Sequence, residues 1–338
     1  MNQTRSLELL SKFRSCRVAV VGDFLLDQYV LGTSARVSRE APIVVVDYQD
    51  TVYHPGGAAN AAQNVTALGG ACHAVGVVGD DHEADVLIRL LGARDVDTTH
   101  VERHAPAATS TKLRILAGEM NAQKQQVARV DRSHRLSATP DLLTHLRTAV
   151  DDVAERCDVV LLADYGLGVL GAELGAHVLA RCASRRPTVV DSRHRMLEFR
   201  GATVATPNEV EAMEALSLRE ESELLDGPSL SRRIAATGIE NLIVTRGSKG
   251  MVVCGARGNY ARIGIAGSDA ATDVTGAGDT VSAVVALSLA AGASLEEAAH
   301  MATFAASVVV MKRGTATASV DEMRDVIERN AAERTART

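Results

Sequence analysis

Between residues 141 and 245 the sequence alternates short, continuous apolar runs with stretches whose apolar residues recur at helical spacing. Continuous apolar runs are typical of strands that are buried on both faces. Their alternation with helices predicts a doubly wound α/β fold with a mostly parallel sheet. Residues 17–21, which run into Gly22-Asp23, fit a further strand of the same sheet.

Two stretches, residues 28–54 and 105–132, interrupt this alternation because each contains strand-like pieces without a helix between them. The pieces are residues 43–46 and 51–53 in the first stretch, and residues 109–116 and 125–130 in the second. We interpret them as insertions that together form a small antiparallel β layer. Open α/β sheets bind ligands at the carboxyl ends of their strands, and we expect this layer to overhang that edge as a lid. The sequence thus predicts one domain over residues 1–330, with a charged, frayed tail at residues 331–338.

Composition limits the class of partner. The net charge of −6 over 338 residues argues against nucleic acid or an anionic membrane as the main partner. The apolar run at residues 281–291 is too short to span a bilayer, and five scattered cysteines fit a reducing compartment. We expect a cytoplasmic protein that binds a small molecule. The apolar strand at residues 43–46 predicts a homodimer through the β layer.

The stretch Asp273-Val-Thr-Gly-Ala-Gly-Asp279 carries the main chemical signal. Gly276, Ala277 and Gly278 lie between a strand-like segment and a long apolar helix, so their backbone N–H groups and the helix dipole would form an anion site. Asp279 would then be placed to take a proton from a hydroxyl that attacks a bound phosphoryl group. Taken alone, so short a motif is more often an ordinary helix start.

A competing signal is Gly166-Leu-Gly168-Val-Leu-Gly171, which matches a dinucleotide-binding fingerprint with Asp191 about 20 residues further on. However, Asp164-Tyr165 lies between the strand and the first glycine, where a carboxylate would repel a pyrophosphate. The fingerprint also gives no role to the glycine turns at Gly56 and Gly276. We therefore disfavour a nicotinamide dehydrogenase.

Two further motifs have both a structural and a functional interpretation. Asn208 and Glu211 have the spacing of a capping box, and also that of a polar pair that positions a Mg²⁺-bound water. Thr245-Arg246-Gly247 ends a strand with small residues, as a hairpin turn or a nucleotide-binding backbone would. Spacing alone favours the structural interpretation of both.

Taken together, these motifs resemble the ribokinase-like (pfkB) family of sugar kinases across essentially the whole chain. Residues 273–279 resemble its C-terminal signature, and Pro55-Gly-Gly-Ala-Ala-Asn60 resembles its N-terminal one. The resemblance implies phosphoryl transfer from ATP to a sugar, with Mg²⁺ and a K⁺ ion as expected cofactors. Asp279 would be the catalytic base, and the amides of the anion hole would be those of Gly276, Ala277 and Gly278.

The resemblance also implies roles for other motif residues. Residues expected to hold sugar hydroxyls are Asp27, Gly56, Gly57 and Asn60. Residues expected at the nucleotide are Asp191, Asn208, Glu211, Thr245, Gly247 and Gly314, of which Asn208 and Glu211 would organise Mg²⁺ through water. A monovalent cation would lie at Asp273 and Thr275.

Residues 21–27, 34–44 and 164–170 resemble, more narrowly, the heptose 7-phosphate kinase branch of lipopolysaccharide core synthesis. This implies transfer to the anomeric hydroxyl of D-glycero-D-manno-heptose 7-phosphate, giving the 1,7-bisphosphate. Substrate contacts would then include Asp164 and the lid cations Arg36, Arg39 and Lys112, with Arg114 and Lys124 also available. Many relatives have Pro at position 39 and Lys at position 167, where this chain has Arg39 and Leu167.

Relatives in that branch often carry a C-terminal nucleotidyltransferase domain, and we expect this chain to be monofunctional. Two alternatives stay open. One is a kinase for another sugar or sugar phosphate with the same machinery. The other is a sugar-binding regulator without catalysis, which the intact Asp279 and the two glycine turns disfavour.

Overall fold

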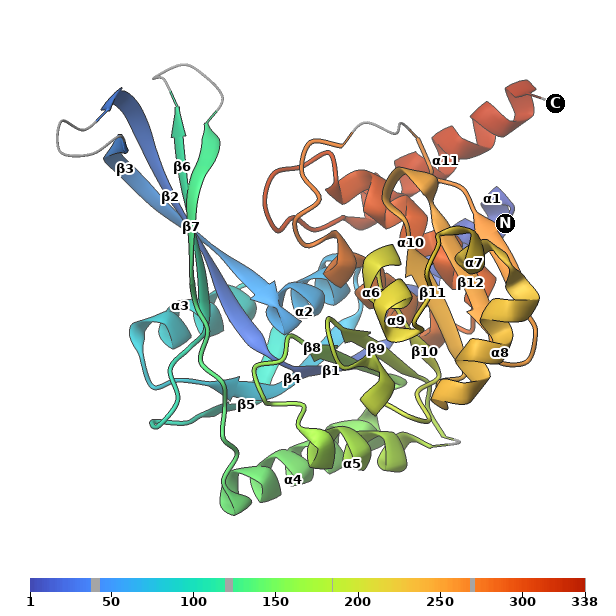
Figure 1. Cartoon of the computed structure of the whole chain (residues 1–338), viewed down its shortest axis with the longest axis horizontal. Helices are drawn as coiled ribbons and strands as arrows, with labels where there is room; N and C mark the ends of the chain where they lie inside the picture. The colour runs from blue at the N-terminus through green and yellow to red at the C-terminus, as the bar shows by residue number, and fades with distance from the viewer. Residues whose placement is uncertain (38–42, 119–123, 184, 268–270, 338) are drawn as a thin grey trace.

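The computed structural model describes residues 1–37, 43–118, 124–183, 185–267 and 271–337, and Figure 1 shows their arrangement. Within these residues the strands form two sheets. The larger sheet has the strand order β13-β12-β11-β10-β9-β8-β1-β4-β5, and the smaller has the order β3-β2-β6-β7. The predicted doubly wound α/β fold with a small lid sheet is confirmed.

Neighbouring strands of the larger sheet pair in parallel from β5 to β11, and β12 pairs antiparallel with both β11 and β13. Its strands are β1 (Arg17–Gly22), β4 (Ala71–Val78), β5 (Val96–Arg103), β8 (Val159–Asp164), β9 (Thr188–Ser192), β10 (Val204–Ala205), β11 (Asn241–Thr245), β12 (Met251–Gly255) and β13 (Tyr260–Ile263).

Helices cover both faces of this sheet, and β1 shows why. Its successive side chains point to opposite faces, so Val18 and Val20 join one buried cluster while Ala19 and Val21 join the other. The first cluster contains side chains of α1 (Gln3–Lys12), η1 (Phe13–Ser15), α2 (Ala58–Ala67), α3 (His82–Gly92), α9 (Ala277–Ala290), α10 (Leu295–Val309) and α11 (Val320–Arg337). The second contains side chains of α4 (Pro140–Arg156), α5 (Ala172–Cys182), η2 (Met196–Glu198), α6 (Glu209–Ala215), α7 (Ser222–Leu225) and α8 (Gly227–Thr237). A short η3 (Gly247–Lys249) links β11 to β12.

None of the helices in the described part of the chain is long and apolar enough to cross a membrane.

The smaller sheet projects from the body of the molecule (Figure 1) and matches the two predicted insertions. Its strands are β2 (Phe24–Val37), β3 (Val44–Gly57), β6 (Thr111–Gly118) and β7 (Gln125–Arg132). Each hairpin is antiparallel, as predicted, but the central pair β2–β6 is parallel. The strand pieces predicted near residues 43–46 and 51–53 are one continuous strand, β3.

The segment before α9 differs from its predicted form. The chain before Gly276 was expected to be strand-like, but residues 271–275 are irregular. They are held instead by the end of α10, because the backbone N–H groups of Thr272 and Asp273 both donate to the carbonyl oxygen of Val310, at 2.7 and 3.0 Å. The glycine turn is therefore fixed by the helix that follows α9 rather than by a neighbouring strand.

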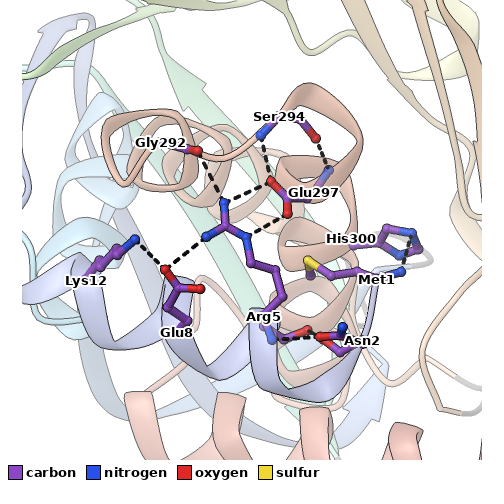
Figure 2. Close-up of polar contacts among 10 residues, drawn as sticks. Met1, Asn2, Arg5, Glu8, Lys12, Gly292, Ser294, Glu297 and His300 are labelled. Carbon is purple, nitrogen blue, oxygen red and sulfur yellow. Dashed lines mark hydrogen bonds and ion pairs between the residues drawn. The ribbon is translucent and has the colours of Figure 1, made fainter.

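At the opposite end of α9, the N-terminal helix α1 is fixed to α10 by polar contacts (Figure 2). Arg5 donates from Nε and Nη2 to the two carboxylate oxygens of Glu297, at 2.7 and 3.2 Å. The Glu297 side chain also completes a capping box with Ser294 at the start of α10. The Arg5 hydrogen bonds lower the pKa of Glu297 to about 2, so this carboxylate stays ionised at neutral pH.

Candidate active site

Two glycine turns, far apart in the sequence, meet where α2 and α9 begin. Asn60, in the first turn of α2, donates from Nδ2 to the Asp279 Oδ2 atom at 2.7 Å and to the Gly276 carbonyl oxygen at 3.3 Å. One turn further on, the Thr280 hydroxyl donates to the Asn64 side-chain oxygen at 3.1 Å. The pairing places the predicted anion turn and the predicted sugar-binding turn at one point.

Gly276 is the N-cap of α9 and has a left-handed backbone with φ of +77°. Residues with a Cβ atom rarely adopt this conformation. A Cβ atom at this position would also lie 2.5 Å from Asn60 Nδ2. The first N–H groups of a helix have no partner within the helix, and Gly276, Ala277 and Gly278 all line the adjoining cavity. The turn can therefore present its amides to an anion in that cavity, although the Ala277 N–H group also donates to the Val274 carbonyl oxygen at 3.2 Å.

Asp279 is buried, with 3% of its surface exposed. The Tyr165 hydroxyl donates to its Oδ1 atom at 2.5 Å, and Asn60 donates to its Oδ2 atom. Burial raises the pKa of Asp279 to about 6, although both hydrogen bonds and the charge of Lys112 act to lower it. A carboxylate with a pKa in this range can accept a proton at neutral pH and release it again.

Tyr165 lies in a loop that the buried Asp23 organises. The Asp23 carboxylate accepts from the backbone N–H groups of Tyr165, Leu167 and Val169, at 2.8, 3.0 and 3.1 Å. The glycine-rich sequence that resembled a dinucleotide fingerprint thus wraps around a carboxylate rather than a pyrophosphate. Sequence reasoning assigned no role to Asp23 or to Tyr165, and their positions directly after β1 and β8 were the available signal.

Asp164 was predicted to contact substrate, and its oxygens are engaged by protein groups. Oδ1 accepts from Arg195 at 2.5 Å and from the Gly166 backbone at 3.1 Å, while Oδ2 accepts from Ser192 at 2.6 Å. Asp164 nevertheless lines the cavity. Its contacts fix the start of the loop that carries Tyr165.

A cavity of about 580 Å³ extends from these residues in two directions. At one end it is lined by residues of the lid sheet and at the other by the strand ends beyond β9. Of the residues predicted to form the site, it brings together Asp27, Gly57, Lys112, Asp164, Asp191, Asn208, Glu211, Thr245, Gly247, Thr275, Gly276, Ala277, Gly278 and Asp279.

The lid end of the cavity contains four cationic side chains, which differ in whether a carboxylate pairs with them. Arg114 pairs with Asp27 at 2.8 Å, and Arg129 pairs with Asp131 at 2.6 Å. Among the described residues, Lys112 and Arg193 have no carboxylate within ion-pair distance. Burial lowers the pKa of Lys112 despite the neighbouring charge of Asp27. Lys112 and Arg193 are therefore the cavity cations that can take a new anionic partner.

The other predicted lid cations do not join this group. Arg39 lies outside the described residues, and Arg36 is described only as a backbone position of β2. Lys124 bonds to Gln49 at the exposed part of the lid. Gly56 faces Asp27, since a Cβ atom at position 56 would lie 2.9 Å from Asp27 Oδ2. This close approach places the backbone of the first glycine turn against the Asp27–Arg114 pair.

At the other end, Asn208 and Glu211 form the capping box of α6, with hydrogen bonds of 3.0 and 2.9 Å. Asn208 also bridges to Thr245 at the end of β11. Gly247 has φ of +55° and open space on its Cβ side. Burial, with the charges of Asp279 and Glu211, raises the pKa of Asp191 to about 8. At this end of the cavity, the carboxylates of Asp191 and Glu211 therefore lie near the open backbone of Gly247.

Asp273, Thr275 and Gly314 meet in a second cavity of about 500 Å³ beneath the lid. The Asp273 carboxylate accepts from the backbone N–H groups of Thr275 and Gly314, both at 2.9 Å. Burial acts to raise the pKa of Asp273, but a hydrogen bond from the Thr275 side chain, together with these two backbone hydrogen bonds, outweighs it and lowers the pKa. Gly314 therefore lies with the two residues predicted to hold a monovalent cation and does not line the cavity that contains Thr245 and Gly247.

Comparison with known sequences gives a consistent match. Residues 17–323 match the family described as pfkB family carbohydrate kinase. The chain is 36% identical over 340 residues to the bifunctional protein HldE of Syntrophotalea carbinolica, covering 98% of this chain and 67% of the relative. It is 38% identical to the HldE of Chromohalobacter salexigens, covering 93% of this chain and 64% of the relative. The chain spans about two thirds of the length of these relatives.

Comparison with solved structures shows the same fold. Ribokinase of Arabidopsis thaliana, complexed with ribose and ATP, superposes with a TM-score of 0.67 at 19% identity and covers 94% of this chain and 98% of that one. Phosphofructokinase-2 of Escherichia coli, in complex with substrates and products, gives a TM-score of 0.74 at 18% identity and covers 94% and 99%. At this identity the likeness establishes the ribokinase-like fold alone.

Proposed function

Because the chain belongs to the pfkB family of carbohydrate kinases and its matched residues form a sugar kinase domain, we propose that it phosphorylates the anomeric hydroxyl of D-glycero-D-manno-heptose 7-phosphate. ATP is the proposed donor and the 1,7-bisphosphate the proposed product. The observation that carries the proposal is the placement of Asp279, which lies between a cation-lined and a glycine-lined part of one cavity. The relatives named bifunctional protein HldE and the heptose kinase-like segments support the choice of sugar.

In this proposal Asp279 accepts the proton of the attacking sugar hydroxyl. Its pKa of about 6 keeps it ionised at neutral pH, and Asn60 and Tyr165 fix its orientation. The amides of residues 276–278 lie at the start of α9, where the helix dipole is positive, and stabilise the charge that develops on the transferring phosphoryl group. Orientation of the base and neutralisation of charge are the main contributions a protein makes to this reaction.

The residues at the carboxylate-rich end fit a divalent cation. Asp191, Glu211 and Asp279 lie close enough for their charges to raise the pKa of Asp191, and a cation nearby would relieve this repulsion. Oxygen ligands and bound waters suit Mg²⁺, and we propose that Asn208 and Glu211 hold it through water. When bound, Mg²⁺ neutralises charge on the nucleotide phosphates. Thr245 and Gly247 would border the nucleotide, and Asp273 with Thr275 would hold a K⁺ ion.

The lid end of the cavity fits a phosphorylated sugar. Asp27 and Arg114 are available to sugar hydroxyls. Lys112 and Arg193 have no carboxylate partner in the part of the chain that the structure describes, and they suit a phosphate. Because Asp27, Lys112 and Arg114 lie on β2 and β6, the lid itself carries the groups that would bind the sugar. Binding there would also exclude water from the base and limit ATP hydrolysis.

A panel of sugars tests the proposal. We expect ADP release with heptose 7-phosphate and little with ribose, fructose, fructose 6-phosphate or adenosine. Turnover with an unphosphorylated sugar alone would contradict the heptose assignment while leaving a sugar kinase. Binding of the sugar without turnover of any member would favour a sugar-binding regulator.

The charge of Lys112 has a separate expected effect. In Lys112→Ala the KM for heptose 7-phosphate should rise by roughly 10–100-fold, since a hydrogen bond between charged groups is lost. The KM for ATP should change little. The matched control is Arg132→Ala, because Arg132 is a cation of the lid strand β7 that pairs with Glu83 and lines neither cavity. Steady-state kinetics at pH 8, where Asp279 is ionised in each protein, measure both. An unchanged KM for the sugar would exclude Lys112 as a phosphate ligand.

We further propose that the lid sheet forms a homodimer. Five large apolar side chains on or beside its strands are between 44% and 67% exposed: Ile43, Val44, Tyr48, Val127 and Val130. An exposed apolar sheet of this kind is typical of an interaction surface.

Sedimentation velocity tests the dimer. The wild-type protein should sediment at about twice its chain mass of 35.6 kDa, and Val44→Glu with Val130→Glu should shift it to the monomer. Leu197→Glu, an exposed apolar position outside the lid, should leave the dimer intact. A monomeric wild-type protein over the micromolar range would contradict the proposal.

A further inference from the structure

Tyr165 contacts the proposed base and also Lys112 and Arg193, the two cavity cations that pair with no carboxylate within the described ranges. It belongs to neither signature motif. We propose that Tyr165 is a positioning residue that holds the Asp279 carboxylate in its reactive orientation and aligns Lys112 and Arg193 beside it. The inference rests on the proposed function, because it assigns a role within the same site. It adds a link between the group that takes the proton and the groups that bind the remote phosphate.

The first part of the argument concerns the hydroxyl. Burial, followed by the charge of Asp279, raises the pKa of Tyr165 well above its ordinary value. The hydroxyl is therefore protonated at neutral pH, and toward the ionised Asp279 carboxylate it acts as a donor, with the Oδ1 atom 2.5 Å away. A permanent donor to an ionised carboxylate lowers the pKa of that carboxylate. Tyr165 thus counteracts the effect of burial on Asp279.

The second part concerns orientation. An ionised carboxylate has about four acceptor positions on its two oxygens. Tyr165 occupies one on Oδ1 and Asn60 occupies one on Oδ2, so the plane of the Asp279 carboxylate is fixed from both sides. Acceptor positions remain for an incoming hydroxyl from the cavity that Asp279 lines. With either donor removed, the carboxylate could rotate away from that hydroxyl.

The third part concerns the ring. Lys112 Nζ lies 4.6 Å from the centroid of the Tyr165 ring, and the Arg193 guanidinium carbon lies 5.7 Å from it. Both distances are within the range of cation–π attraction. The two cations come from β6 and from the loop after β9, and the ring is a contact that they share. Loss of the ring should therefore disturb phosphate binding as well as the base.

The backbone of Tyr165 is fixed independently of these contacts. Asp23 accepts from the Tyr165 backbone N–H group and from two further amides of the same loop. A change of the Tyr165 side chain should leave this loop in place, because none of those three hydrogen bonds uses the side chain. Substitutions at position 165 can consequently separate the hydroxyl from the ring.

Two variants make that separation. Tyr165→Phe keeps the ring and removes the hydroxyl, so we expect kcat to fall roughly tenfold while the KM for heptose 7-phosphate stays within about twofold. The acidic limb of the kcat/KM profile, expected near pH 6 in the wild type, should move up by roughly one pH unit. Tyr165→Leu should show the same changes and also raise the KM for the sugar phosphate by roughly tenfold.

A direct titration gives a readout that does not require turnover. In protein with ¹³C-labelled aspartate carboxyl groups, the Asp279 signal is identified by its absence from Asp279→Asn. Its midpoint should rise in Tyr165→Phe and stay at the wild-type value in Tyr260→Phe. The latter is a matched control, because the Tyr260 hydroxyl donates to a backbone carbonyl at Leu225, outside the cavity.

The outcomes separate this inference from the proposed function. If the wild-type enzyme turns over none of the sugars in the panel, the proposed function fails, whatever the titration shows. If the wild type is active but Tyr165→Phe keeps both the wild-type pH profile and the wild-type Asp279 midpoint, the positioning role is excluded. A fall in kcat for Tyr165→Phe with no change of either pH midpoint would also contradict it, since a purely structural role predicts that pattern.

Discussion

Asp279→Asn is expected to lower kcat by roughly 10²–10⁴-fold or more, because the amide cannot take a proton from the attacking hydroxyl. The change should leave the local hydrogen bonds intact. The new amide oxygen can still accept from Asn60, and the Tyr165 hydroxyl can accept from the new amide N–H group instead of donating. The melting temperature should not fall at pH 8, since a buried ionised group is replaced by a neutral group of the same shape.

Binding and turnover must be measured separately for this variant. Calorimetric titration with heptose 7-phosphate should give nearly the wild-type affinity, while single-turnover transfer from labelled ATP should be slowed by the full factor. Asp226→Asn is a suitable control, because Asp226 caps α8 outside the cavity and asparagine is an equally good cap. Near-wild-type turnover by Asp279→Asn would remove the base from the mechanism, and loss of sugar binding would indicate a damaged site.

The parts of this site that could be predicted from sequence are those whose chemistry lies within one short motif. The glycine turn at residues 276–278 and the turn at Gly56 and Gly57 each combine special backbone needs with adjacent polar residues, and the structure brings them together through Asn60 and Asp279. The continuous apolar strands likewise predicted the parallel sheet, because burial on both faces leaves few alternatives.

The parts that could not be predicted depend on tertiary contacts. Tyr165 acts across 114 residues on Asp279, and Asp23 organises amides more than 140 residues away. Neither pair has a local spacing that would reveal it. Gly314 was assigned to the nucleotide through the family resemblance, and its hydrogen bond to Asp273 places it at the cavity beneath the lid.

Some strands of the two sheets could likewise not be predicted from the sequence. The edge strand β5 was not predicted, because its alternating polar and charged residues leave only Val96 fully buried. The long strand β3 was predicted only as two fragments, and no strand was predicted at the position of β2. Their pairing has register shifts near Leu31 and Ser34, and such irregularities interrupt the two-residue alternation from which a strand is predicted.

Gly276→Ala should have the second largest effect, since it disturbs the anion turn and the base together. An alanine with φ near +77° is strained by about 1–2 kcal/mol. Its Cβ atom would also lie 2.5 Å from Asn60 Nδ2, so Asn60 must move away from Asp279. We expect kcat to fall by roughly 100-fold, because a displacement of about 1 Å at a reacting group can cost that much.

Gly292→Ala separates strain from collision. Gly292 lies just beyond the opposite end of the same helix, α9, with φ of +82°, but a Cβ atom there would meet no other atom within 4 Å. Both variants should therefore lower the melting temperature by a few degrees through strain, while only Gly276→Ala should lose activity. Thermal unfolding of the two purified proteins measures their melting temperatures, and steady-state kinetics measures their kcat. If Gly276→Ala keeps wild-type kcat, the approach of Asn60 to this turn does not control the orientation of Asp279. If both variants lose activity equally, the loss reflects general destabilisation of α9 rather than the geometry of the anion turn.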